Sequence, residues 1–161
     1  MVSIAVIAAA GKGTRLMPAT KEQPKEMLPI VSNGMIKPIL HLIVEQLHAS
    51  GINKIFMITG RDKRAVEDHF IQNYQLLDEL SNKADIKKML QDFYDILGKI
   101  NISYINQPRP EGFGAAVQLA ENYLNNSDSF FLTSGDSIVF SLRDGHSTNF
   151  IKRITDAHIK Y

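Results

Sequence analysis

Short apolar runs alternate with helix-like stripes of apolar residues along the chain. Four of the runs are typical of buried strands, because they are short, continuous and bounded by glycine or polar residues. These predicted strands cover residues 4–9, 54–59, 100–105 and 129–133. The alternation predicts an α/β fold with a mainly parallel sheet, since strands separated by helices are joined by right-handed crossovers.

Five stretches carry apolar residues at intervals of three and four positions, which is the spacing of one helix face. They cover residues 39–47, 66–80, 86–97, 117–124 and 150–158. Pro38 and Gly51 are favourable boundary residues for the first of them. We expect residues 62–98 to form two helices that leave the sheet between two strands.

Three polar stretches follow predicted strands, at residues 11–15, 107–114 and 135–136. The carboxyl ends of parallel strands meet at one edge of a sheet, and ligands of such sheets bind beyond that edge. We therefore expect these stretches to form one site.

Length and composition limit the function. The 161 residues suit one domain with a real core, and the net charge of +1 argues against a general nucleic-acid partner. No apolar run approaches the ~20 residues that span a bilayer, and we see no signal peptide, so we expect a cytoplasmic protein without a membrane partner. The absence of cysteine excludes disulfides, zinc–thiolate sites and cysteine nucleophiles.

Residues 8–29 place four bases and two acids beside a glycine-rich turn. The turn is not a P-loop, because Gly11-Lys12 is followed by Gly13 instead of serine or threonine. It is not a dinucleotide fingerprint either, because Leu16 stands at the third glycine position. A turn that needs glycine only for its backbone conformation is the plain alternative to a phosphate site.

Residues 11–30, GKGTRLMPATKEQPKEMLPI, resemble the signature of the sugar-1-phosphate nucleotidylyltransferases. The form PATKEQPKEMLP is similar to the bacterial UTP–glucose-1-phosphate uridylyltransferase branch in particular. The resemblance implies a three-layer, Rossmann-like fold of the nucleotide-diphospho-sugar transferase (GT-A-like) type, with helices on both faces of the sheet. It also implies transfer of a uridylyl group from UTP to glucose 1-phosphate, giving UDP-glucose and pyrophosphate, with Mg²⁺ as cofactor.

The resemblance assigns the first loop to the nucleotide. Backbone amides around the glycines can point at a triphosphate without a Cβ in the way, and Arg15 can contact phosphate oxygens in bidentate fashion. Lys25 can supply compact charge to the phosphate under attack, so Arg15 and Lys25 are the implied catalytic pair. In the family the glutamate that matches Glu26 lies near the nucleoside, where a carboxylate can accept from ribose hydroxyls. The implied binding residues of this loop are Ala9, Ala10, Gly11, Gly13, Thr14, Arg15, Lys25 and Glu26.

The second loop lies in residues 106–117, NQPRPEGFGAAV. The amide of Gln107 offers a donor and an acceptor, which complement the acceptor and donor on the edge of uracil. Gly112 lets the backbone approach the base, and in the family the corresponding glutamine and glycine recognise the base. This chain has Glu111 where the uridylyltransferase pattern usually has lysine, which is a departure from the branch.

The third loop places Asp136 directly after a strand. Mg²⁺ prefers oxygen ligands, and the family has an acidic metal ligand here, so Asp136 is the implied ligand. A simple turn is the alternative. The five histidines, by contrast, show no metal-ligand spacing and are predicted to be surface or core residues: His41, His48, His69, His146 and His158.

Members of the family run considerably longer than this chain. Their second half carries sugar-binding loops, a lysine for the sugar phosphate and a second aspartate for Mg²⁺, and none of these motifs is found here. We therefore expect residues 1–161 to be the nucleotide-binding part of an apparently truncated domain whose sugar-binding half is absent. The uncovered apolar surface could drive assembly into a homo-oligomer. A non-catalytic nucleotide-binding module and a thymidylyltransferase remain alternatives.

Overall fold

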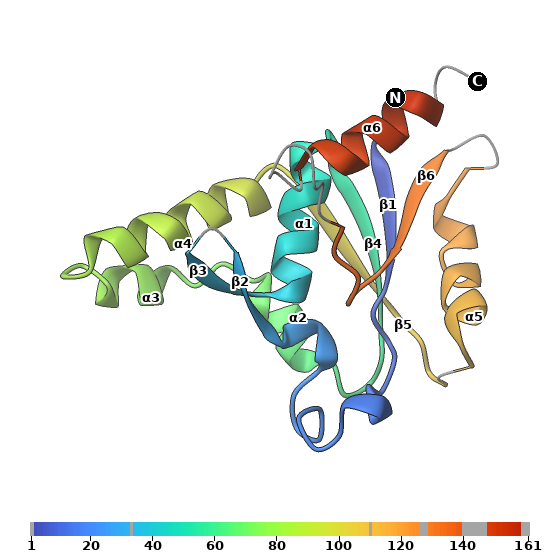
Figure 1. Ribbon diagram of the computed structural model, residues 1–161, viewed down its shortest axis with the longest axis horizontal. Helices are drawn as coiled ribbons and strands as arrows, with labels where there is room; N and C mark the ends of the chain where they lie inside the picture. The colour runs from blue at the N-terminus through green and yellow to red at the C-terminus, as the bar shows by residue number, and fades with distance from the viewer. Residues whose placement is uncertain (1, 33, 110, 126–128, 140–147, 159–161) are drawn as a thin grey trace.

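The computed structural model describes residues 2–32, 34–109, 111–125, 129–139 and 148–158. His146, one of the five histidines, and Pro110, in the second loop, lie outside the described residues. Figure 1 shows one main sheet with helices on both sides and a small hairpin beside it.

The main sheet has four strands, and all of its pairings are parallel, as predicted. Along the sheet the order is β5-β4-β1-β6. The strands are β1 (Ile4–Ala8), β4 (Lys54–Thr59), β5 (Asn101–Asn106) and β6 (Phe130–Ser134). The chain adds β4 and β5 on one side of β1 and then returns to add β6 on the other side. The topological switch point, where such sheets bind ligands, therefore lies between β1 and β6.

Successive residues of β1 and β4 point to opposite faces of the sheet, as a strand requires. Ala5 and Ile7 pack in the larger core with α1, α2 and α4, whereas Val6 packs in a smaller core with α5. The two cores give three layers, which is the architecture that the family resemblance implied. The helices are α1 (Ile39–Ala49), α2 (Arg64–His69), α3 (Tyr74–Glu79), α4 (Ala84–Leu97), α5 (Phe113–Gln118) and α6 (Thr148–His158).

The excursion between β4 and β5 holds three helices, α2, α3 and α4, so the prediction of two helices is wrong. The apolar stripe over 66–80 is divided by Asn73, whose side-chain oxygen accepts a hydrogen bond of 3.0 Å from the backbone N–H of Leu76. Asparagine is a strong N-cap because it satisfies a free amide of the first turn. It therefore begins α3 as a separate helix.

The helix predicted over residues 117–124 is observed earlier in the chain, as α5. Helix α5 ends at Gln118 and is followed by a short 3-10 turn, η3 (Glu121–Tyr123). Two further 3-10 turns lie in the first loop, η1 (Thr14–Leu16) and η2 (Lys25–Met27).

A hairpin that the apolar pattern did not predict links the first loop to α1. Its antiparallel strands are β2 (Pro29–Ser32) and β3 (Met35–Pro38). Gly34 has a φ of 75°, which favours glycine, and Asn33-Gly34 is a common turn sequence of hairpins. Val31 and Ile36 face each other across the strands at 73% and 72% exposure.

Two histidines pack together between α1 and α2. His41 Nδ1 lies 3.0 Å from His69 Nε2, and the His41 ring stacks on Phe93 with ring centres 3.8 Å apart. Both histidines line a pocket of about 330 Å³ away from the strand ends. Burial, together with the charge of His41, lowers the pKa of His69 from 6.5 to about 4. Of the two, His41 is buried and His69 is half-buried.

The depressed pKa of His69 predicts a pH-dependent stability. The unfolded chain protonates this histidine near pH 6.5 and the folded chain only near pH 4, so the free energy of unfolding should fall as the pH drops through that window. Urea unfolding of His69→Asn at several pH values should show a shallower fall than the parent. An equal flattening in His48→Asn would contradict the assignment to His69.

Candidate functional site

Loops from all four strands of the main sheet meet at one edge, which lies at the bottom of Figure 1. The three predicted stretches follow β1, β5 and β6, whose parallel pairing aligns their carboxyl ends. The prediction of a common edge is therefore confirmed. The loop after β4, residues 60–63, joins them and was not predicted.

The glycine turn after β1 packs on the side chain of Lys25. Gly13 has a φ of 67°, and its carbonyl accepts a hydrogen bond of 2.7 Å from the Thr20 hydroxyl. A Cβ on Gly11 would lie 3.6 Å from Cε of Lys25, and a Cβ on Gly13 would lie 3.4 Å from its Cβ. The two glycines thus lie alongside the Lys25 side chain, one near its base and one near its end.

Lys25 is tied to the loop after β6. Its Nζ lies 2.6 Å from Oδ2 of Asp136, while Oδ1 of Asp136 accepts a hydrogen bond of 2.8 Å from Ser134. Burial alone would raise the pKa of Asp136, but the hydrogen bonds from Lys25 and Ser134 and the Lys25 charge outweigh it and lower the pKa. The carboxylate is therefore ionised at neutral pH.

Glu26 lies behind this pair and is fully buried. Its Oε2 accepts a hydrogen bond of 2.7 Å from Lys63 Nζ, and Lys63 is itself only 5% exposed. The Oε1 atom lies 4.0 Å from Lys25 Nζ and has no hydrogen-bond partner among the described residues. In this arrangement the Glu26 carboxylate faces two lysines, and the ribose contact that the resemblance implies stays a prediction.

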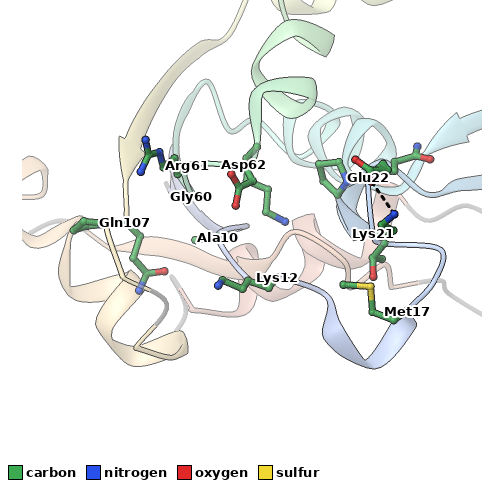
Figure 2. A pocket seen from close by; sticks show the side chains of 14 residues that line it. Ala10, Lys12, Met17, Lys21, Glu22, Gly60, Arg61, Asp62 and Gln107 are labelled. Atoms are coloured by element: carbon green, nitrogen blue, oxygen red, sulfur yellow. Dashed lines mark ion pairs between the residues drawn. The ribbon is translucent and has the colours of Figure 1, made fainter.

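The open pocket beside this cluster has a volume of about 590 Å³. Figure 2 shows Gln107 on one side of it, the Lys21–Glu22 ion pair on the other, and Lys12 and Asp62 between. Its charged lining has four cations, Lys12, Lys21, Arg61 and Lys63, and two acids, Glu22 and Asp62. A net positive pocket of this kind attracts an anionic ligand.

Gln107 lines the pocket at the end of β5. Its backbone N–H donates a hydrogen bond of 2.7 Å to the Thr59 carbonyl, which continues the pairing of β4 with β5. The residue is only 7% exposed and lines the pocket. Its side-chain amide can both donate to and accept from a ligand there.

The structure places the predicted residues in different parts of this edge. Ala10 and Gln107 line the pocket, whereas Gly11, Gly13, Lys25, Glu26 and Asp136 belong to the neighbouring cluster. Thr14 and Arg15 lie exposed on η1, and Arg15 forms no ion pair with any described residue. Ala9 is fully buried, its N–H bonded to Ile58, and Gly112 starts α5 with a φ of 100°.

Sequence reasoning missed Lys63, the partner of Glu26. The signal was present, because Lys63 follows a predicted strand in the same way as the three stretches that were chosen. A lysine in a polar loop is usually solvated, however, and its burial depends on a carboxylate 37 positions away.

Comparison with known proteins gives a consistent result. Residues 4–158 match the family described as nucleotidyl transferase. The chain is 42% identical over 157 residues to a UTP–glucose-1-phosphate uridylyltransferase of Bacillus subtilis, covering 98% of this chain and 49% of that protein. It is 40% identical over 156 residues to a uridylyltransferase of the same name from Staphylococcus epidermidis, covering 96% of this chain and 50% of that one.

Solved structures that superimpose on this chain are enzymes of the same kind as its relatives in sequence. An apo UDP-glucose pyrophosphorylase superimposes with a TM-score of 0.84 at 31% identity, covering 100% of this chain and 56% of that chain. A UTP-bound enzyme of this kind from Acinetobacter baumannii gives a TM-score of 0.78 at 28% identity, covering 98% and 54%. The chain therefore spans about half the length of the curated relatives that it matches.

None of the described helices is long and apolar enough to cross a membrane.

Gly135, next to Asp136, provides a test of how closely the loops pack. An added Cβ would lie 2.9 Å from Cγ of Glu26 and 3.0 Å from Cβ of Ala9, so Gly135→Ala should lower the free energy of unfolding by about 1–3 kcal/mol. Gly114→Ala is the matched control, because nothing lies within 4 Å of its added Cβ. Equal stability of both variants in urea unfolding would contradict the packing described.

Proposed function

The chain belongs to the nucleotidyl transferase family, and we propose that it binds UTP for the transfer of a uridylyl group to glucose 1-phosphate, with release of pyrophosphate. The observation that carries this proposal is the Lys25–Asp136 ion pair at the switch point between β1 and β6, next to a positively lined pocket. The names of the relatives support the choice of reaction. The chain covers about half the length of each relative, so the transfer reaction of the whole enzyme is proposed for this chain and not taken over from the relatives.

The pocket suggests how UTP is held. Gln107, which lines the pocket, offers its side-chain amide to the donor and acceptor edge of uracil, and Gly112 leaves room for the backbone near the base. The cations that line the pocket and the glycine turn after β1 take the triphosphate. Arg15, exposed and without an ion pair in the described part of the chain, adds a bidentate phosphate contact.

Asp136 is the residue proposed to hold Mg²⁺. Its carboxylate lies beside the hydroxyl of Ser134, which in turn contacts the hydroxyl of Ser137, and hard oxygen donors of this kind suit Mg²⁺. The described residues contain no group of three or more side chains that could hold a metal alone. A single carboxylate that shares the ion with substrate phosphates fits this arrangement. When bound, the ion would neutralise phosphate charge.

The residues of the chain then act by position and charge. An oxygen of the sugar phosphate attacks the α-phosphorus of UTP in line, and the bond from that phosphorus to the bridging oxygen of the β-phosphate breaks, releasing pyrophosphate. Lys25 and Arg15 stabilise the negative charge that develops on the phosphate oxygens, and the loops hold the two reactants in alignment.

A protein without cysteine that uses a nucleoside triphosphate suits the cytoplasm.

A second candidate function is nucleotide binding without turnover. It is supported by the positively lined pocket, which suits an anionic ligand whether or not a second reactant binds. The exposed Val31–Ile36 pair on the hairpin supports a self-associating form in either case.

Pyrophosphate release with UTP, glucose 1-phosphate and Mg²⁺ distinguishes the two functions. Turnover supports the transferase, whereas saturable UTP binding without turnover supports the binding module. Arg15→Ala and Lys25→Ala should each weaken UTP binding by roughly 10- to 100-fold, because each loses charge-assisted contacts to phosphate. Lys99→Ala, at an exposed site after α4, is the matched control. Unchanged UTP affinity in both loop variants would contradict either function.

Discrimination between bases tests the role of Gln107. The parent chain should bind UTP more tightly than CTP by about 100-fold, since cytosine leaves the glutamine amide mispaired. Comparison with dTTP tests the thymidylyltransferase alternative. Gln107→Leu should bring the UTP and CTP affinities within about threefold of each other, measured by calorimetry. A preference for UTP that survives in Gln107→Leu would place base recognition elsewhere.

A further inference from the structure

We propose that Glu26, anchored by Lys63, is the alternative partner of Lys25 and receives its ammonium when Asp136 binds a divalent cation. Glu26 and Lys63 are then positioning residues for the catalytic lysine. This inference rests on the proposed function, because it takes Asp136 as the cation ligand.

The first observation is the incomplete hydrogen bonding of Glu26. Its carboxylate is fully buried, and a buried charge is stable only when it is paired and hydrogen-bonded. Lys63 satisfies Oε2 at 2.7 Å, but Oε1 has no hydrogen bond to any described residue. A buried carboxylate oxygen without a partner marks a place for one more donor.

The second observation is the position of the nearest donor. Lys25 Nζ lies 4.0 Å from the free Oε1 and 2.6 Å from Oδ2 of Asp136. The ammonium carries three donors on a flexible stem, so a shift of about 1 Å would bring it to hydrogen-bond distance of Oε1. Gly11 carries no Cβ beside this end of the side chain, which leaves room for the ammonium to turn.

The third observation is that both carboxylate oxygens of Asp136 already accept a hydrogen bond. Oδ1 of Asp136 accepts from Ser134, and Oδ2 is occupied by Lys25. A divalent ion that approaches Asp136 therefore meets an ammonium of the same sign, and the repulsion favours its departure. With Glu26 as the acceptor, Lys25 leaves Asp136 but stays beside the phosphates that it must stabilise.

Lys63 keeps the acceptor in place. It supplies the charge that balances Glu26, and both side chains are almost wholly inaccessible to solvent. Gly135 closes the other side, where even a Cβ would lie 2.9 Å from Cγ of Glu26. These contacts hold the Glu26 carboxylate in place. The hydrogen bond between Lys25 and Glu26 therefore forms by a movement of Lys25.

Binding of Mn²⁺ alone to the nucleotide-free chain tests this exchange, measured by electron paramagnetic resonance. Lys25→Met should tighten Mn²⁺ binding about tenfold, because the competing ammonium is gone. Glu26→Gln should weaken Mn²⁺ binding several-fold while Lys25 is present and by less than about twofold in the Lys25→Met background. Such coupling is not expected if Glu26 only supports the fold.

Two results would overturn the inference: no tightening in Lys25→Met, or an equal effect of Glu26→Gln in both backgrounds. Glu26→Gln leaves Lys63 unpaired, so Glu26→Gln/Lys63→Met is measured beside it, with thermal unfolding as the check on folding. In this double variant both positions are uncharged. It should weaken Mn²⁺ binding when Lys25 is present and have little effect in the Lys25→Met background.

Asp136→Asn separates this inference from the proposed function. It should abolish specific Mn²⁺ binding. If it does so while the coupling between Lys25 and Glu26 is absent, the exchange alone is refuted. If Mn²⁺ binding is unchanged in Asp136→Asn, both the metal assignment and the exchange are refuted.

Discussion

The need to compensate a buried carboxylate organises the functional edge of this protein. Glu26 is fully enclosed, and its charge is stable there only because Lys63 contacts one oxygen and Lys25 lies near the other. Through these lysines Glu26 joins the loops after β1 and β4, and Lys25 extends the connection to Asp136 after β6. Three segments that are distant in sequence are thereby held in one cluster. The positively lined pocket lies directly beside it, and Lys63 belongs to both.

The sheet makes this meeting of loops possible. Parallel pairing brings every carboxyl strand end to the same edge, and the order β5-β4-β1-β6 places the switch point between β1 and β6. At that point the loops after β1 and β6 meet in the ion pair of Lys25 with Asp136. Gly135 continues the pairing with β1 through a hydrogen bond of 2.9 Å from its N–H to the Ala8 carbonyl. It thus carries Asp136 to within reach of Lys25 without a side chain that would displace Glu26.

The fold was largely predictable because periodicity reports burial, and burial decides strands and helices in an α/β protein. The hairpin of β2 and β3 was not predicted because Val31 and Ile36 are exposed. It has no buried face that would give a periodic pattern of apolar residues. The division of the 66–80 stripe depended on the single cap Asn73. In the site, the residues named by resemblance do lie at one edge, while their roles remain predictions. Lys63 could not be distinguished from a solvated lysine without the tertiary contact to Glu26.

The most direct test of the central claim is the amide NMR spectrum of the chain during titration with UTP and Mg²⁺. Binding at the strand-end site predicts saturable shifts, at a common UTP concentration, in residues 10–26, 60–63, 107–114 and 134–137. The signals of the pocket lined by His41 and His69 should stay in place. Shifts confined to that second pocket, or shifts at the strand ends that persist unchanged in Asp136→Asn and Lys25→Ala, would contradict the account.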